Sequence, residues 1–196
     1  MRALPPSVLS ALLILPLLMA CSGGASNKDP VAEAKFQNEK RIGNEAVTEK
    51  QERDAEFMVT AASRGLLDLE LSQLAQRKAT APDVKYLAQM LVGAHGTIQT
   101  DLKAVADKKS IVLPTNLGKD QAQRVGELTA LNGPAFDRKY LELLEDSHQR
   151  SLNDFDDMSD DAYDGDIRAF AAKYVPTFKT HREAAEKAFD QLPQQP

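Results

Sequence analysis

Several features that would assign the chain to a particular class of protein are scarce or missing from its 196 residues. A single cysteine excludes an internal disulfide framework and a cysteine-based zinc site. Ten glycines and ten prolines are too few for collagen or a long low-complexity region. Lys and Arg number 24 against 29 Asp and Glu, without a basic block, so nucleic-acid binding through clustered cations is not expected. The composition indicates one soluble domain with short appendages.

The motifs of several enzyme classes are also missing. The chain has no phosphate-binding G-x-x-x-x-G-K-[ST], no dinucleotide-binding G-x-G-x-x-G, no nucleophile elbow G-x-S-x-G and no H-E-x-x-H. The acidic stretch 154–164 lacks the spacing of a calcium loop, and we interpret it as a solvated turn. Ser147 and Ser151 lie near His148 but have no positioned acid to complete a catalytic triad. The sequence therefore leaves enzymatic activity open.

The longest apolar run lies near the N-terminus, over residues 8–20, and Arg2 is the charged residue that precedes it. It contains Pro16 and is too short to cross a bilayer core of about 30 Å, but it fits the hydrophobic region of a signal peptide. Its end, Leu-Met-Ala-Cys at 18–21, resembles the lipobox of bacterial lipoproteins. That resemblance implies a signal peptide over 1–20, with Cys21 lipidated by groups such as palmitate. The alternative is a free cysteine at an ordinary signal-cleavage site.

The residues after the cysteine predict where such a lipoprotein resides. In such lipoproteins an Asp directly after the cysteine resembles a signal for retention in the inner membrane, and this chain has Ser22 there. We therefore expect the protein to be anchored in the outer membrane and to face the periplasm. Two or three acyl chains give firm anchoring. We interpret residues 21–53 as the lipidated N-terminus and a polar tether that passes into a frayed helix, and about 28 coil residues would have a root-mean-square span of about 30 Å. Whether residues 31–53 extend the first predicted helix stays open. The expected partners are the membrane, through Cys21, and a protein of the envelope.

From about residue 54 the pattern changes to long segments with apolar residues at helical spacing and no alternating strand pattern. The predicted helices cover 54–79, 82–108, 119–131, 134–158 and 164–190, followed by a tail at 191–196. Short connections within the first and last pairs predict two antiparallel hairpins, and the long one predicts a crossover that carries the short helix 119–131. We therefore expect an all-α, ferritin-like four-helix bundle over 54–190.

The three histidines of the chain lie on the apolar stripes of three different predicted helices. His148, for example, lies between Leu144 and Leu152, one turn away on either side. Counted from the expected helix starts, His95, His148 and His181 lie at similar depths. In a bundle of helices of similar length, all three imidazoles are expected near the middle of the core.

Acidic residues on the predicted helices bear on two hypotheses for the core around the three histidines, a metal site and a structural polar layer. Depth favours Asp68 as the acid of the first helix, with Glu70 as the alternative, and Glu145 precedes His148 in an E-x-x-H spacing. Three imidazoles with one or two carboxylates bind iron, manganese, zinc or copper. A carboxylate-bridged di-metal site needs two E-x-x-H motifs and is not expected. The other hypothesis is a buried polar layer that fixes how the helices pack.

Several segments resemble the bacterial family catalogued as domain of unknown function 4142. The resemblance covers about 54–190 and rests on Leu-Asp-Leu-Glu-Leu-Ser-Gln-Leu-Ala at 67–75, Val-Lys-Tyr-Leu-Ala-Gln-Met-Leu at 84–91, Gly-Pro-Ala-Phe-Asp-Arg-Lys-Tyr at 133–140 and Tyr-Val-Pro-Thr-Phe at 174–178, with the three histidines. The family pattern has Glu at the place of Asp68 and Asp-His at the place of Ala94-His95. The resemblance implies a ferritin-like fold and a secreted setting, and it brings no established activity.

Three functional hypotheses follow from these patterns. The first is a lipid-anchored periplasmic bundle that serves as a binding or envelope-stress module. The second is a metal-binding protein or metal-dependent oxidoreductase that uses a histidine and carboxylate site in the bundle core. The third is a structural interaction protein of the cell envelope.

Overall fold

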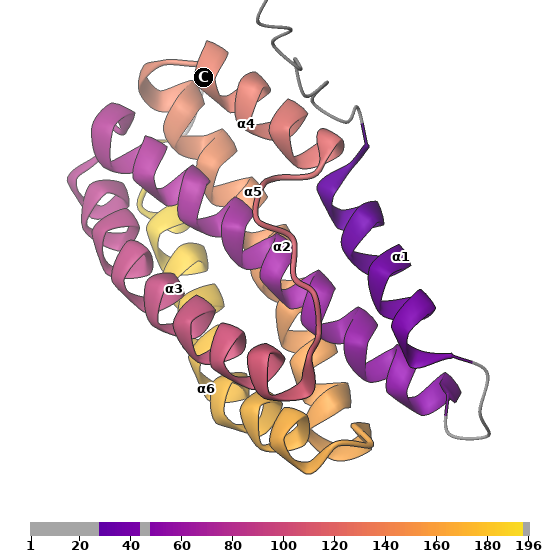
Figure 1. Cartoon of the computed structure of the whole chain (residues 1–196). Helices are drawn as coiled ribbons and strands as arrows, with labels where there is room; N and C mark the ends of the chain where they lie inside the picture. Colours follow the sequence, from indigo (N-terminus) through magenta and orange to yellow (C-terminus); the bar gives the residue numbers. More distant parts are fainter. Residues whose placement is uncertain (1–27, 44–47, 194–196) are drawn as a thin grey trace, which may run out of the picture.

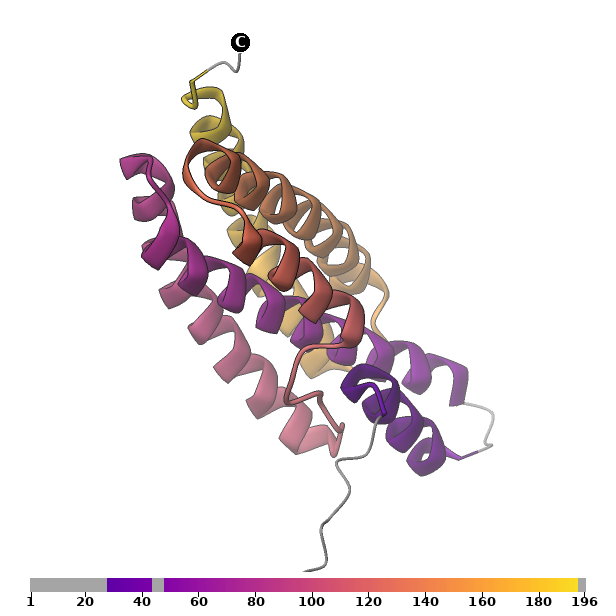
Figure 2. The ribbon, with the colours of Figure 1, turned by 90° about the horizontal axis from the view of Figure 1, so that it is seen from above.

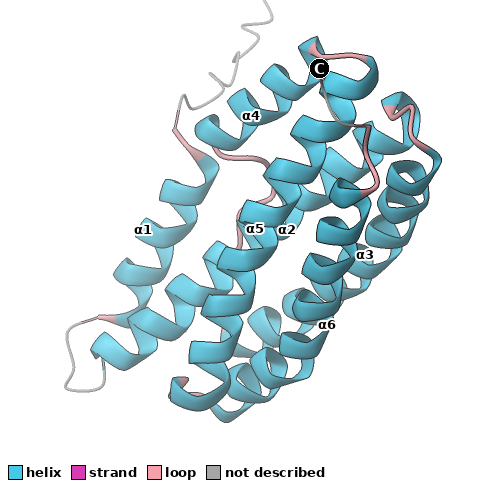
Figure 3. Cartoon of the chain, turned by 180° about the vertical axis from the view of Figure 1, so that it is seen from behind, coloured by secondary structure: helices cyan, strands magenta, loops and turns pink. Residues whose placement is uncertain are grey.

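Two antiparallel helical hairpins form the body of the molecule. The structure is a computed structural model that describes residues 28–43 and 48–193, and all regular structure in these ranges is helical, which confirms the all-α prediction (Figure 3). Within each hairpin the helices pack along their length, and α2 also packs on α5 while α3 packs on α6 (Figures 1 and 2). The long helices are α2 (Thr48–Lys78), α3 (Pro82–Lys109), α5 (Gly133–Asp161) and α6 (Gly165–Asp190).

A long crossover joins the two hairpins and carries the short helix α4 (Lys119–Ala130). The crossover leaves the end of α3 and runs along α2 to about its middle, where α4 begins, and α4 packs on α2 and α5 (Figure 1). The side chain of Gln121 donates to the carbonyl of Ser63 at 3.0 Å and ties α4 to α2. The predicted order of short, long and short connections is therefore the observed one.

The N-terminal part of the described chain differs from the expected tether over 21–53. Residues 30–42 form α1 (Pro30–Ile42), which lies beside α2, and α2 begins at Thr48 instead of 54 (Figure 1). Polar contacts fix α1, because Asn38 exchanges two hydrogen bonds with the backbone of Val112, at 2.9 and 2.8 Å. A search for a continuous apolar stripe misses such a helix, since α1 buries only Ala34 and Asn38.

Buried carboxylates join each hairpin turn to the opposite hairpin. Asp137 of α5 accepts hydrogen bonds from the backbone N–H groups of Thr80 and Ala81, in the turn before α3. Asp54 of α2 accepts from the N–H groups of Tyr163 and Asp164, in the turn before α6. The two hairpins therefore hold each other's turns, which fixes the relative height of all four long helices.

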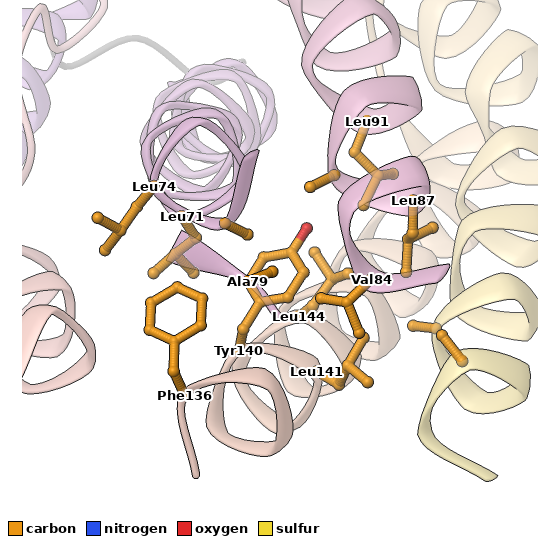
Figure 4. Packing of buried hydrophobic residues seen from close by; sticks show 14 of the residues in the cluster. Leu71, Leu74, Ala79, Val84, Leu87, Leu91, Phe136, Tyr140, Leu141 and Leu144 are labelled. Carbon is orange, nitrogen blue, oxygen red and sulfur yellow. The ribbon is translucent and has the colours of Figure 1, made fainter. Parts of the chain in front are cut away.

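The core consists of two apolar clusters with polar residues between them. One cluster fills the end of the bundle near the α2–α3 turn, where leucines of α2, α3 and α5 surround Tyr140 (Figure 4). The other fills the opposite end and is rich in aromatic residues, among them Phe57, Phe155, Phe170 and Phe178. None of the helices in the described ranges has the length and apolarity needed to span a membrane. The boundary between the clusters is where the candidate site lies.

Candidate metal centre

The four long helices each place one ionisable side chain at the boundary between the two apolar clusters. On α3, His95 follows Leu91 of one cluster and precedes Ile98 of the other. The same change of cluster occurs around His148 on α5, around His181 on α6 and near Asp68 on α2. The relative exposures of His95, His148 and Asp68 are 0%, and that of His181 is 4%. The regular apolar spacing of each helix thus directs a polar group into the core.

The three imidazole rings form a compact triangle. Their centroids are separated by 5.1 Å between His95 and His148, 5.6 Å between His95 and His181, and 5.4 Å between His148 and His181. One ring nitrogen from each histidine lies within 4.8 Å of the other two, and the closest pair, the Nε2 atoms of His95 and His148, is 3.2 Å apart. The structure therefore brings together the three histidines that the sequence placed on separate helices.

The backbone of α5 sets the tautomer of His148. Its Nδ1 lies 2.9 Å from the carbonyl oxygen of Leu144, which only accepts hydrogen bonds, so Nδ1 carries the proton and Nε2 keeps its lone pair. Burial lowers the pKa of His148 to about 4, although the bond to Leu144 raises it. The neutral ring therefore directs an electron pair at the centre of the triangle.

Burial also keeps the other two imidazoles unprotonated. It lowers the pKa of His181 to about 4, with a further lowering from His148. The pKa of His95 falls well below its ordinary value for the same reason, with His148 and His181 adding to the effect. At neutral pH the triangle consists of three neutral imidazoles, which is the state that binds metal ions.

Asp68 brings a carboxylate to the edge of this triangle. Its Oδ2 lies 3.8 Å from Nε2 of His95, and neither carboxylate oxygen accepts a hydrogen bond of standard geometry. Burial raises the pKa of Asp68 to about 7, while the nearby Ser147 hydroxyl and the charge of Arg64 act in the lowering direction. A buried carboxyl group without hydrogen bonds is costly, and a cation beside it removes most of that cost.

The distances fit the ligand shell of a metal ion. Two imidazole nitrogens bound to one tetrahedral Zn²⁺ at about 2.0–2.1 Å lie roughly 3.3 Å apart. The Nε2 atoms of His95 and His148 match this separation at 3.2 Å. The bond from His148 Nδ1 to a backbone carbonyl is also the outer contact that orients ligating histidines in metalloproteins. The residues present therefore fit a single ion held mainly by nitrogen.

Two of the candidate acids lie outside the site. Glu70 and Glu145 are both exposed, so Asp68 is the carboxylate that faces the imidazoles. Glu145 shares the E-x-x-H spacing with His148, but it lies one position beyond the apolar stripe marked by Leu141 and Leu144, and its side chain reaches solvent. The E-x-x-H spacing alone places Glu145 and His148 on one side of α5. The buried stripe is too narrow to include both, so His148 is buried and Glu145 is exposed.

Other polar residues of the layer were not among the site residues predicted from the sequence. Ser72 and Tyr140 share a buried hydrogen bond of 3.1 Å between their hydroxyl oxygens. Burial raises the pKa of Tyr140, and the charge of Asp68 adds to this effect. Ser147 lies directly before His148 and is buried. The signal was available, because small hydroxyl residues at 72, 147 and 151 interrupt otherwise apolar helical faces.

Comparison with known proteins places the chain in a family. Residues 40–188 match the family described as Domain of unknown function (DUF4142). The chain belongs to the DUF4142 family. The DUF4142 match begins within α1, includes α2, α3, α4 and α5, and includes Asp68 and all three histidines. The resemblance noted in the sequence is thereby confirmed.

A solved structure shares the fold. It is described as the crystal structure of a DUF305 fragment from Deinococcus radiodurans, with a TM-score of 0.63 and 16% sequence identity. The alignment covers 71% of this DUF4142 chain and 97% of that chain. Among curated proteins no match is found. At this identity the likeness concerns the fold alone. The proposed lipidation residue, Cys21, lies outside the described residues.

Proposed function

We propose that this DUF4142 protein is a metal-binding protein whose ion is held in the bundle core by His95, His148 and His181. The observation that carries the proposal is the buried cluster in which one nitrogen from each imidazole lies within 4.8 Å of the others. Three neutral imidazoles suit zinc, copper, iron or manganese, whereas calcium and magnesium require shells of oxygen ligands. The four-helix scaffold supplies the rigid elements that such a site needs.

The second part of the proposal concerns location. We propose that Cys21 is lipidated and anchors the bundle at the outer membrane, facing the periplasm, which the lipobox-like residues 18–21 and Ser22 support. Residues 22–29 separate Cys21 from α1, and eight residues reach at most roughly 30 Å even when fully extended. A lipid on Cys21 therefore keeps the bundle close to the membrane surface. Such a protein binds its metal in the compartment between the two membranes.

One observation also favours a purely structural layer. The 3.2 Å between the Nε2 atoms of His95 and His148 suits an N–H···N hydrogen bond as well as two bonds to one ion. In that case the imidazoles would only fix how the helices pack, which is the commoner role of buried polar groups. The unsatisfied oxygens of Asp68 favour the metal, because the hydrogen bond between histidines leaves them without a partner.

Metal analysis of the purified protein decides between the two functions. A protein that begins after Cys21 is purified without chelator and then loaded separately with Fe(II), Mn(II) or Zn(II). We expect close to one ion per chain, and we expect His148→Ala to lose it. His181→Gln, at the edge of the core, serves as a second variant if His148→Ala loses its helical circular dichroism.

The matched control is Glu145→Gln, which changes the exposed acid one turn from His148 and should retain the ion. Wild-type protein that stays free of metal after every loading, with the helical signal intact, would contradict the proposal. The imidazoles would then belong to a structural layer.

A further inference from the structure

The position of Asp68 tells what kind of metal site the three histidines form. We propose that the Asp68 carboxylate is the fourth ligand, so that the core holds one divalent, four-coordinate ion in a closed site with no position left for a substrate. This inference rests on the proposed function and goes beyond it, because it assigns the site to ion holding and excludes catalysis at the ion.

Asp68 reaches the triangle at His95, and it lies outside the group of three imidazole nitrogens that are within 4.8 Å of one another. Its Oδ2 lies 3.8 Å from Nε2 of His95, the same nitrogen that lies 3.2 Å from His148. Ligand atoms around one tetrahedral ion lie about 3.3 Å apart, and rotation of a carboxylate about its side-chain bonds covers the difference. Asp68 comes from α2, so the four ligands come from the four long helices, one from each. Such an ion would join both hairpins.

Charge also favours Asp68 as a direct ligand. A divalent ion with three neutral imidazoles leaves two positive charges in an apolar core, and an uncompensated buried charge is strongly unfavourable. Asp68 is fully buried, and its oxygens lack hydrogen-bond partners that would hold them elsewhere. The basic residue one turn before it, Arg64, is already paired with Asp154. The carboxylate is thus available to neutralise part of the charge of the ion.

Aromatic rings cover the imidazoles on the side of the second apolar cluster. The ring of Phe178 lies 5.8–6.4 Å from all three imidazole centroids, and Phe155 packs behind it at 4.6 Å. Five cavities in the described part of the chain are lined by other residues, and neither Asp68 nor a histidine lines any of these five. Substrate sites are concave and open, and catalytic metal ions keep one position free for water or substrate. A site without such space holds an ion and does no chemistry on a substrate.

Cobalt spectroscopy with a small anion tests this inference. The protein is loaded with Co(II), whose visible bands are intense when the ion has four ligands in a tetrahedral arrangement, and azide is then added as a probe for an open position. We expect intense bands in the wild type that azide leaves unchanged. We expect Asp68→Ala to bind Co(II) more weakly by about tenfold or more. Its spectrum should respond to azide, because the fourth position has become free.

Two further proteins complete the experiment. Glu70→Gln, an exposed acid on the same helix, is the matched control and should behave as the wild type. Asp68→Asn keeps the volume of the side chain and takes the place of Asp68→Ala if the latter loses its helical signal; it too should bind more weakly and change the cobalt bands.

The outcomes separate this inference from the proposed function. A wild-type cobalt spectrum that shifts with azide, or Asp68 variants that bind Co(II) with unchanged affinity and spectrum, would overturn the closed site while leaving the three-histidine site in place. Wild-type protein that takes up no Co(II), Zn(II), Fe(II) or Mn(II) would overturn both.

Discussion

Burial decides the charge of the ionisable side chains in the core. His148 and His181 have pKa values lowered to about 4, so both are neutral in any mildly acidic or neutral solution. Asp68 has its pKa raised to about 7 and is therefore partly protonated at neutral pH in the metal-free protein. Burial away from water thus keeps the three imidazoles neutral, with lone pairs that can bind a cation. It also leaves a carboxyl group whose ionised form a bound cation would stabilise.

The raised pKa of Asp68 predicts how the stability of the metal-free protein changes with pH. The folded state holds a proton on Asp68 up to about pH 7, whereas the unfolded state releases it near 3.8, so folding stability falls as the pH rises between these values. Asp68→Asn has no proton to release. We expect its stability relative to the wild type to increase by about 2.5–3 kcal/mol between pH 5 and pH 8, since a full proton corresponds to about 1.4 kcal/mol per pH unit over the two units up to pH 7.

Chemical unfolding in the presence of a chelator, at several pH values, measures this difference. The histidines act in the opposite direction, because their lowered pKa values make the unfolded state bind more protons between about pH 4 and 6.5. Their effect is common to both proteins and cancels in the comparison. Glu70→Gln is the control and should follow the wild type. A stability difference between Asp68→Asn and the wild type that is the same at every pH would contradict a raised pKa of the buried Asp68 carboxyl group.

The sequence predicted that the three histidines converge in the core, which the structure shows, and it left the choice of acid open. Helical spacing places His95, His148 and His181 on apolar stripes, and stripes face the core. Choosing between Asp68 and Glu70, and rejecting Glu145, depends on a few tens of degrees of helix rotation. That rotation is set by the packing of neighbouring helices, which no single-helix pattern contains.

Among the helices, the two hairpins hold one another through their turns. Asp137 of the second hairpin accepts four hydrogen bonds from the α2–α3 turn, two of them from the N–H group of Thr80, and Asp54 of the first hairpin accepts two from the α5–α6 turn. These contacts satisfy N–H groups at the start of α3 and next to α6, where a helix leaves its first donors unpaired. The reciprocal arrangement fixes the heights at which the imidazoles meet.

Removing one of these carboxylates should weaken the whole bundle. Asp137→Ala leaves the N–H groups of Thr80 and Ala81 without their acceptor, and hydrogen bonds to a carboxylate make a net contribution of about 1.5–3 kcal/mol each. We expect a loss of about 2–4 kcal/mol in the free energy of unfolding, measured with urea. Asp157→Ala, an exposed acid on the same helix, should change it by less than about 0.5 kcal/mol. Equal stabilities of the two variants would show that the turn contact contributes little.

The sequence left open whether the segment that forms α1 is helical, because polar contacts fix this helix. Lys28 and Glu33 form an ion pair at its start, and Asp29 caps it by accepting from the N–H groups of Val31 and Ala32. The same carboxylate accepts from the N–H group of Lys119 at the start of α4, 90 residues away. Such long-range polar contacts produce no periodic pattern in the sequence, whereas the spacing of apolar residues predicts the four long helices.

For the molecule as a whole, the proposal joins a buried ion site to a lipid anchor. Substitution of Cys21 by serine removes the only thiol that can carry the acyl groups. We expect the Cys21→Ser protein to lose labelling by palmitate and to move from the outer-membrane fraction to the soluble periplasmic fraction. Ser22→Asp is the matched comparison, which should keep the lipid and move the protein to the inner membrane. Unchanged fractionation of Cys21→Ser would contradict a lipid anchor.

Anomalous diffraction from crystals of metal-loaded protein shows whether the core histidines hold an ion. We expect one strong anomalous peak per chain inside the bundle, about 2.0–2.1 Å from a ring nitrogen of His95, His148 and His181, with an oxygen of Asp68 at a similar distance. A core without a peak, with the rings of His95 and His148 joined by a hydrogen bond and the metal found only at surface carboxylates, would contradict this expectation.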